Sequence, residues 1–467
     1  MLMPLPTVVF RLAMIGGAAL TAALVGAVGG QAVDAWTLRS VLVGTLVLLT
    51  WASSPRPARA IWLSPLFLLA GWSLVFYSLI PALLLAIDFD LLTGTMEPTL
   101  IGFSGQPADV LILVFSGVCQ AGAALCAAVL GSHRPASTEP APLLAGDRQR
   151  LAFMALAIAA AAGHFLGARL EVIWRLSDIV PASLVQNVLD GLPPLQAIII
   201  MVLLVDAMAS RKYGPTLAVA ATLAACAAVE VATGNSKFPV YLVLVAALTW
   251  VVKSRHRWQT KAAVCVVASV FALGSLSLMS QIRGNTAYTL NWSTPDIVGQ
   301  GLAKTLLMKI GERQYETGYC LGGVLRKNAG QPGENSPFYF ISALVPRFLW
   351  PDKPNLSPFN HYAAAYCGGH DLNPLHSASI TLLGEPIEQA GMPGLRVALA
   401  VLLAGLSILA VSCLNNNSFR FIIFAALTPW LMDFDQNYSL YWTNALKMAI
   451  YMLPVLALVA VLRGRVR

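Results

Sequence analysis

The sequence predicts an all-α polytopic membrane protein with about twelve transmembrane helices. Its composition supports this fold class, because the 467-residue chain is 57% hydrophobic and 11% charged, with a mean hydropathy of +0.70. Soluble domains carry about 25% charged residues. The apolar residues also gather in blocks of roughly 17–25 residues, the length that a helix needs to cross a bilayer. We therefore expect one integral membrane bundle.

Twelve apolar blocks define the expected spans. They cover residues 7–29, 36–52, 61–87, 109–131, 151–170, 195–210, 215–233, 238–252, 262–281, 395–413, 421–432 and 445–462. The first block is too long for the apolar core of a signal peptide, so it counts as a span. The chain then divides into nine spans with short loops (1–280), a long polar segment (281–394) and three further spans (395–467).

Basic residues predict the orientation of these spans. They gather in alternate loops and in the C-terminal tail, at Arg56, Arg59, His133, Arg148, Arg150, Arg211, Lys212, Lys253, Arg255, Arg257, Lys261, Arg463, Arg465 and Arg467. Loops rich in Lys and Arg lie on the cytoplasmic side of a membrane. We expect both termini in the cytoplasm and the long segment on the opposite side of the membrane. The net charge of +8 therefore does not indicate nucleic-acid binding.

The long segment 281–394 is where we expect function, because a connection of this length usually carries it. Its stretch VPRFLWPDKP, residues 345–354, holds three prolines together with Arg347 and Lys353. Each proline fixes its own φ and disfavours helix in the preceding residue, so both cations should lie on a stiff path. Arg and Lys over a membrane cavity suit a phosphate or diphosphate. The alternative is a re-entrant loop that only fills the bundle.

Two residues of this segment are candidates for accepting a proton. Glu385 precedes the tenth span, where partial burial suits such a role. His376 competes, because a neutral imidazole is well matched to proton transfer near neutral pH. Alternatively, Glu385 pairs with Arg347 or Lys353. Glu388 is expected to be solvated.

Metal binding is not expected, because the histidines at 361, 370 and 376 match no metal-ligand spacing. Cys320 and Cys367 both fall in the long segment; if it faces an oxidising compartment they either pair or stay free, and the sequence leaves both alternatives open. The other five cysteines lie in apolar blocks and are expected to be packing residues.

Ionisable residues also occur within or beside the apolar blocks. Inserting a charged side chain into a membrane costs about 2.5–3.5 kcal/mol of free energy at the helix centre. Glu230 and Lys237 flank a short turn, so either they pair or Lys237 helps to bind an anion. His164 is interpreted as a packing residue, and Asp206 as a neighbour of Arg211.

The run PRFLWPDKP, followed by Gly384-Glu385 near the start of a span, resembles the Wzy-type O-antigen and exopolysaccharide repeat-unit polymerases. The turn Gly-Asn-Ser-Lys at 234–237 resembles the Gly-Ser-basic turn of the same family. The resemblance covers residues from about 230 to 394.

The resemblance implies a GT-C-like membrane glycosyltransferase that needs no metal or other cofactor. Such an enzyme moves a growing glycan from undecaprenyl diphosphate to a sugar hydroxyl of the next lipid-linked unit. Arg347 and Lys353 match the basic members of the motif and would stabilise the leaving diphosphate. Lys237 stands where the turn often has Arg, and Glu385 matches the Glu of the GE element. Pro386 departs from the pattern, which more often has an aliphatic residue there.

Further candidates complete the expected site and its partners. Arg283 and Arg313 would add to the diphosphate site, and Tyr315, Tyr339 and Tyr362 would stack on sugars. The expected partners are an undecaprenyl-diphosphate-linked oligosaccharide, the lipid bilayer, and the chain-length regulator and flippase of the same pathway.

Three alternatives stay open. An O-antigen ligase, or another polyprenyl-linked sugar transferase, would use the same donor with a different acceptor. A transporter or flippase of lipid-linked glycan would more often show an internal repeat between its halves, and the sequence shows none. A non-catalytic assembly subunit would tolerate substitution of Arg347 and Glu385. The sequence does not determine the sugar or the stereochemical outcome.

Overall fold

The computed structural model describes part of the chain. The described residues are 63–74, 107–132, 143–144, 146–170, 184–210, 213–233, 237–254, 258–286, 318, 320–328, 345, 350, 362, 365–367, 379–414 and 419–464. Ten longer helices lie in these ranges: α3 (Pro65–Leu74), α6 (Pro107–Ser132), α7 (Asp147–Leu170), α8 (Leu184–Ser210), α9 (Tyr213–Ala232), α10 (Lys237–Lys253), α11 (Trp258–Thr286), α16 (Thr381–Leu414), α17 (Phe419–Leu431) and α18 (Tyr438–Gly464). All regular elements of this part are helical.

These helices confirm an α-helical membrane protein. Five of them, α7, α8, α9, α16 and α18, are long and apolar enough to cross a membrane, and shorter apolar stretches occur in α6, α10, α11 and α17. Large apolar side chains are exposed on several of these helices, as expected for surfaces that face lipid. The expected spans 7–29 and 36–52, and most of 61–87, lie outside the described residues. The number of twelve spans stays a prediction.

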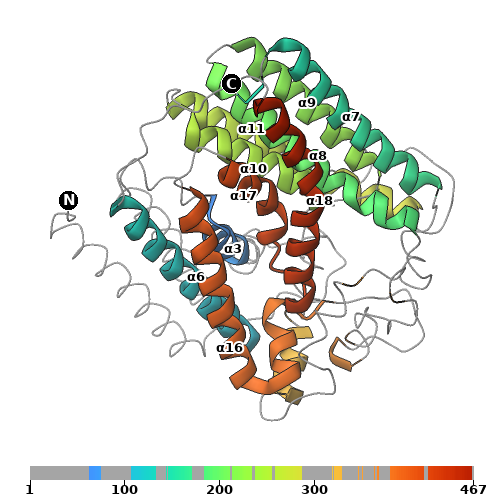
Figure 1. Cartoon of the computed structure of the whole chain (residues 1–467). Coiled ribbons are helices and arrows are strands. Elements are labelled where there is room, and N and C mark those ends of the chain that lie inside the picture. Colours follow the sequence, from blue (N-terminus) through green and yellow to red (C-terminus); the bar gives the residue numbers. More distant parts are fainter. Residues whose placement is uncertain are drawn as a thin grey trace.

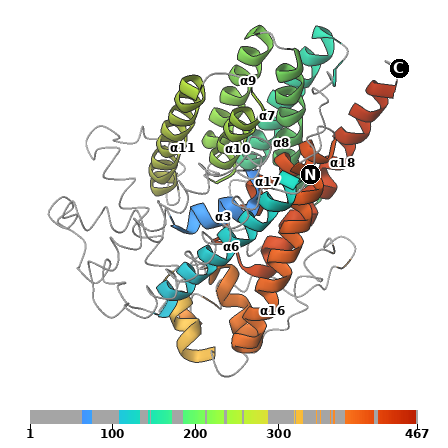
Figure 2. The same cartoon turned by 90° about the vertical axis from the view of Figure 1, so that its left-hand side faces the viewer.

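The described helices form two groups joined by a central pair. One group contains α7 to α11, and the other contains α3, α6 and α16 (Figures 1 and 2). Helices α17 and α18 lie between them: both pack on α8 of the first group and on α16 of the second. The turn between α17 and α18 is therefore placed close to the beginning of α16.

Asp206 links the end of α8 to the beginning of α7 by hydrogen bonds. Its Oδ1 accepts the backbone N–H groups of Leu143 and Leu144 at 2.7 and 2.9 Å, and its Oδ2 accepts Arg150 Nε at 2.6 Å. The expected neighbour, Arg211, lies outside the described residues. The prediction missed Arg150 because antiparallel packing of α7 and α8, and not sequence proximity, brings it to Asp206.

Glu230 and His164 also have a tertiary partner that the sequence did not indicate. His164 Nδ1 lies 2.7 Å from Glu230 Oε2, and this bond joins α7 to α9 across 66 residues. His164 is buried and hydrogen-bonded, which agrees with its interpretation as a packing residue, but its partner was not predicted. Lys237, the expected partner of Glu230, opens α10, and its side chain lies outside the described part.

Helix α16 is two helices joined at a sharp kink. Ala390 and Gly391 leave helical geometry, and Gly391 adopts φ 63°, ψ −159°, a region open essentially to glycine alone. The kink lies close to the expected boundary at 394, with a short packed helix at 381–389 before it and the longer helix of the expected tenth span after it. The long segment was expected to contain short helices, and the Gly and Pro residues of this stretch gave no sign of where this one lies. Helix α11 continues past the expected boundary at 280, to Thr286.

Candidate functional site

The carboxylate of Glu385 binds the beginning of α18. Its Oε2 accepts the backbone N–H of Ser439 at 2.6 Å, and its Oε1 accepts the Ser439 hydroxyl at 2.6 Å. The first N–H groups of a helix have no partner within the helix. Glu385 supplies an acceptor to one of them from a distant helix, and its negative charge also suits the positive end of the helix dipole.

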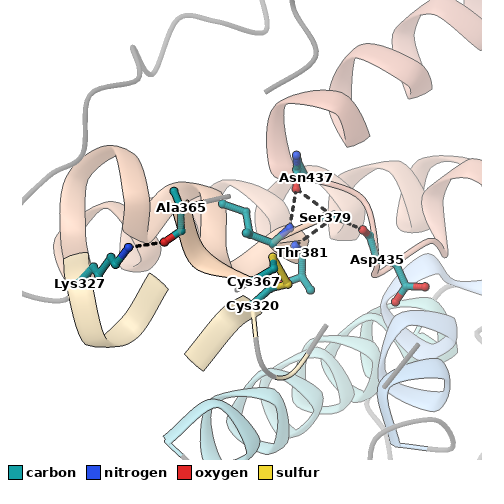
Figure 3. The surroundings of a disulfide bond; sticks show 9 residues. Cys320, Lys327, Ala365, Cys367, Ser379, Thr381, Asp435 and Asn437 are labelled. Atoms are coloured by element: carbon teal, nitrogen blue, oxygen red, sulfur yellow. Dashed lines mark hydrogen bonds between the residues drawn. A yellow bond between two sulfur atoms is a disulfide. The ribbon is translucent and has the colours of Figure 1, made fainter. Parts of the chain in front are cut away.

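The turn before α18 binds the beginning of α16 in return. Asn437 Oδ1 accepts the backbone N–H of Ile380 at 3.0 Å and lies 3.0 Å from the hydroxyl of Ser379. The carbonyl of Phe434 accepts the N–H of Leu382 at 3.3 Å. Figure 3 shows Asn437 and Ser379 facing each other here. The starts of the two helices therefore hold each other in place.

Thr381, between these contacts, is backbone-strained. Its φ is 70°, which is uncommon for a β-branched residue and costs about 1–3 kcal/mol. Its N–H binds the hydroxyl of Ser379 and its own hydroxyl accepts the N–H of Leu383, both at 3.2 Å, so local hydrogen bonds maintain the strained conformation. Strained residues of this kind gather at functional sites, which directs attention to this part of the molecule.

Tyr362 reaches the same carboxylate from the long segment. Its hydroxyl lies 3.5 Å from Glu385 Oε1, and its ring lies 6.1 Å from that of Tyr366. The side chain is 1% exposed. A buried ring cannot stack on a sugar in this conformation, so the expected role of Tyr362 is corrected to that of a neighbour of Glu385.

A disulfide fixes the segment that carries Tyr362. Cys320 and Cys367 are joined, so the structure shows pairing where the sequence had left two alternatives open (Figure 3). Close to this bond, Lys327 Nζ donates to the carbonyl of Ala365. The helical residues 320–328 are thereby connected to residues 365–367 by a covalent bond and a hydrogen bond.

Gly323 permits this close approach. A Cβ atom built at Gly323 would collide with the main-chain carbonyl of Tyr366. Because backbone cannot move aside as a flexible side chain can, the helix and the segment meet closely only with glycine at this position.

Four carboxyl groups lie buried in this region, at Glu385, Glu388, Asp433 and Asp435. Glu388 is 0% exposed, so the expectation that it is solvated was wrong; it belongs to a packed helix and not to a loop. Its charge interacts with that of Glu385 one turn away. Asp433 accepts Gln436 Nε2 at 2.8 Å. The described part of the site is therefore acidic.

The described part of the structure does not include the side chains of the remaining predicted site residues. Lys237 and Arg283 lie on α10 and α11, but their side chains fall outside the description. The others lie outside the described residues altogether: Arg313, Tyr315, Tyr339, Arg347, Lys353 and His376. Of the predicted residues, Glu385 and Tyr362 are the pair that the described structure places in contact.

Ser439, Asn437 and Asp433 were missed by sequence reasoning. They lie in the polar stretch Asp-Phe-Asp-Gln-Asn-Tyr-Ser, residues 433–439, between the last two apolar blocks. This stretch is rich in polar groups and lies on the same side of the membrane as the long segment in the expected topology. That combination could have marked it as part of the site.

The arrangement holds the carboxylate of Glu385 in a fixed position, where it can accept a hydrogen bond from a hydroxyl group. Ser439 makes two bonds of 2.6 Å to Glu385, whereas the Tyr362 hydroxyl lies at the longer distance of 3.5 Å. A hydroxyl that transfers its proton to Glu385 has to lie closer than Tyr362 does, at about 2.6–3.2 Å. Among the described residues, no group of three or more His, Cys, Asp or Glu side chains is arranged to hold a metal ion.

The chain matches no family model, no curated protein and no solved structure.

Proposed function

We propose that this protein is a membrane glycosyltransferase that polymerises lipid-linked oligosaccharide repeat units at the periplasmic face of the bacterial inner membrane. One observation carries the proposal. Glu385, the acidic residue of the resembled Gly-Glu element, is buried and bound by Ser439, and Tyr362 of the long segment reaches it. A carboxylate placed so specifically between segments far apart in sequence suits a catalytic base.

The proposed reaction transfers the growing glycan between two lipid carriers. A sugar hydroxyl of the acceptor unit attacks the anomeric carbon of the donor. The bond from that carbon to the undecaprenyl diphosphate breaks, and its electron pair leaves with the diphosphate. The proton of the hydroxyl passes to Glu385 or, in the alternative, to His376.

The cations of the long segment take the role of stabilising the leaving group. Negative charge develops on the diphosphate as its bond breaks, and preorganised cations stabilise it most strongly where water is excluded. Arg347 and Lys353 are the principal candidates, with Lys237, Arg283 and Arg313 in support. The buried carboxyl groups around Glu385 would repel a diphosphate, so we place the diphosphate on the cationic side and the acceptor hydroxyl at Glu385.

The disulfide supports the periplasmic location. Disulfides persist in oxidising compartments and are rare in the bacterial cytoplasm. Cys320 and Cys367 lie in the long segment, and Tyr362 links that segment to Glu385. The candidate site and the disulfide are therefore proposed to lie on the same, oxidising side, with both chain termini in the cytoplasm.

The glycan profile of a deletion strain tests this function. The strain is complemented with wild type, Arg347→Ala or Arg148→Ala, the last as a control because Arg148 is exposed in the first turn of α7, a helix that contributes no residue to the proposed site. Lipid-linked single units should accumulate and long polymer should be lost in the deletion and with Arg347→Ala, while Arg148→Ala restores polymer.

Two other outcomes would replace the proposal. Long polymer that persists on its lipid carrier but never reaches a final acceptor would indicate an O-antigen ligase. Single units retained on the cytoplasmic side would indicate a flippase. A normal profile in the deletion would exclude all three functions.

A further inference from the structure

A second cluster of buried polar side chains lies away from the candidate site, between α7, α8 and α9. His164 and Glu230 form its centre through their 2.7 Å bond, and each side chain is 1% exposed. Gln196 of α8 is also fully buried. Ionisable residues inside a membrane bundle are rare and usually functional.

The packing of α7 on α8 places Gln196 close to this pair. A Cβ atom at Gly163 would lie 3.3 Å from Leu192, so His164 lies near the level of Leu192. Gln196 follows Leu192 by four residues, which places it about one helical turn away. The three helices pack on one another in all three pairs.

Cys226 connects Gln196 with Glu230. It precedes Glu230 by four residues and so lies on the same face of α9. Its thiol lies beside the Gln196 amide and near Glu230. The polar groups therefore occupy two adjacent layers, with His164 and Glu230 in one and Gln196 and Cys226 in the other.

This cluster retains unused hydrogen-bonding capacity. Within the described part of the chain, Glu230 Oε1 and both polar atoms of the Gln196 amide are buried without a hydrogen bond of good geometry. Buried polar atoms in native proteins nearly always bind protein or ordered water. Glu230 Oε1 and the Gln196 amide lie on neighbouring helices and can both bind water.

Charge balance favours retention of one proton by His164 and Glu230. With one exchangeable proton, His164 and Glu230 are either both neutral or an ion pair, and the net charge is zero in each case. Loss of that proton leaves one uncompensated negative charge, which is costly in an apolar environment.

The other charged groups of the neighbouring helices whose side chains the structure describes lie elsewhere. Asp206 is near the far end of α8 and binds Arg150. Lys253 is the last residue of α10, and Lys261 lies in the first turn of α11. Among the described side chains, Cys226 is another titratable group that lies near Glu230.

We propose that His164, Gln196 and Glu230 form an intramembrane proton-binding site. The proton lies between His164 Nδ1 and Glu230 Oε2. On release it passes to water held by Glu230 Oε1 and Gln196, leaving the pair with one negative charge; on uptake the same water returns it. The site does not depend on the proposed glycosyltransferase activity, because it lies on α7, α8 and α9.

A hydrophobic carbodiimide, dicyclohexylcarbodiimide, provides the test, because it adds to protonated carboxyl groups. The full-length protein in detergent is treated between about pH 5 and about pH 9, and modification of Glu230 is measured by peptide mass spectrometry. We expect modification to rise as the pH falls. Glu230→Gln removes the signal, and the peptide with Glu385 and Glu388 serves as an internal reference.

His164→Gln distinguishes a shared proton from an isolated carboxyl group. Without an imidazole to compete for the proton, modification of Glu230 should increase and its half-maximal pH should rise. Modification that is independent of pH in wild type would overturn the proposal. The same conclusion follows if Glu230 is unmodified at every pH while the reference peptide reacts. A pH profile unchanged by His164→Gln, in a variant that elutes as wild type does, would exclude sharing with His164.

Discussion

At the scale of single residues, Glu385 combines two roles that substitution can separate. Its carboxylate binds the start of α18 through Ser439 and is also the proposed proton acceptor. A structural cap requires only an oxygen acceptor, whereas a base requires a carboxylate.

We therefore predict that Glu385→Gln lowers the polymerisation rate by about 10²–10⁴-fold, since the amide retains an acceptor oxygen but cannot take a proton. Ser439→Ala keeps the backbone N–H that binds Oε2, so it should lower the rate much less. Both rates are measured with purified protein and lipid-linked units, alongside melting temperatures. A variant Glu385→Gln that folds and polymerises normally would leave Glu385 with the capping role only.

Asp206 offers a prediction on stability at the same scale. Asp206→Ala removes the acceptor of two backbone N–H groups and leaves Arg150 without its buried partner, so we expect a loss of about 3–5 kcal/mol. Asp147→Ala is the matched control, because Asp147 also binds Arg150 but its side chain is 89% exposed. Thermal unfolding in detergent should distinguish the two variants. Equal melting temperatures would show that the buried contact contributes little.

At the scale of elements, the kink in α16 decides where Glu385 lies. The first part of the helix bends back against the second, so that a Cβ atom at Gly394 would lie 2.5 Å from the carbonyl oxygen of Pro386. The sequence around this bend, Gly-Glu-Pro-Ile-Glu-Gln-Ala-Gly-Met-Pro-Gly, predicts a loop from its Gly and Pro content. Burial of residues 381–388 makes the stretch helical instead, because tertiary packing outweighs weak local propensity.

Gly391→Ala should therefore destabilise the protein by about 1–3 kcal/mol, because alanine does not tolerate the backbone angles of this residue. Gly274→Ala in α11 is the control: no atom outside its own helix lies within 4 Å of an added Cβ. Its replacement should be neutral or raise stability by up to about 1 kcal/mol. The melting temperatures of the two variants check the prediction, which fails if they change equally.

At the scale of the whole molecule, the disulfide reports on which side of the membrane the candidate site lies. We predict that a membrane-impermeant maleimide labels Cys320 and Cys367 in spheroplasts only after reduction. The five free cysteines lie in apolar helices and should stay unlabelled. Labelling before reduction would show that the bond does not form in cells. Labelling only after the membrane is permeabilised would place this segment in the cytoplasm.

The sequence by itself determined the class of the protein and the position of most described helices. Apolar blocks of sufficient length allow little except a membrane helix, since backbone polar groups in lipid must be satisfied within the segment. The sequence also placed Cys320 and Cys367 in one segment expected outside the cytoplasm, but left open whether they pair.

The tertiary structure alone decided which polar groups meet. Ser439 binds Glu385, His164 binds Glu230 and Arg150 binds Asp206, and each pair joins different helices. Hydropathy specifies that a residue belongs to a span, but the rotation and register of that span follow from packing against its neighbours. The partners of buried polar residues therefore become visible only when the helices are assembled.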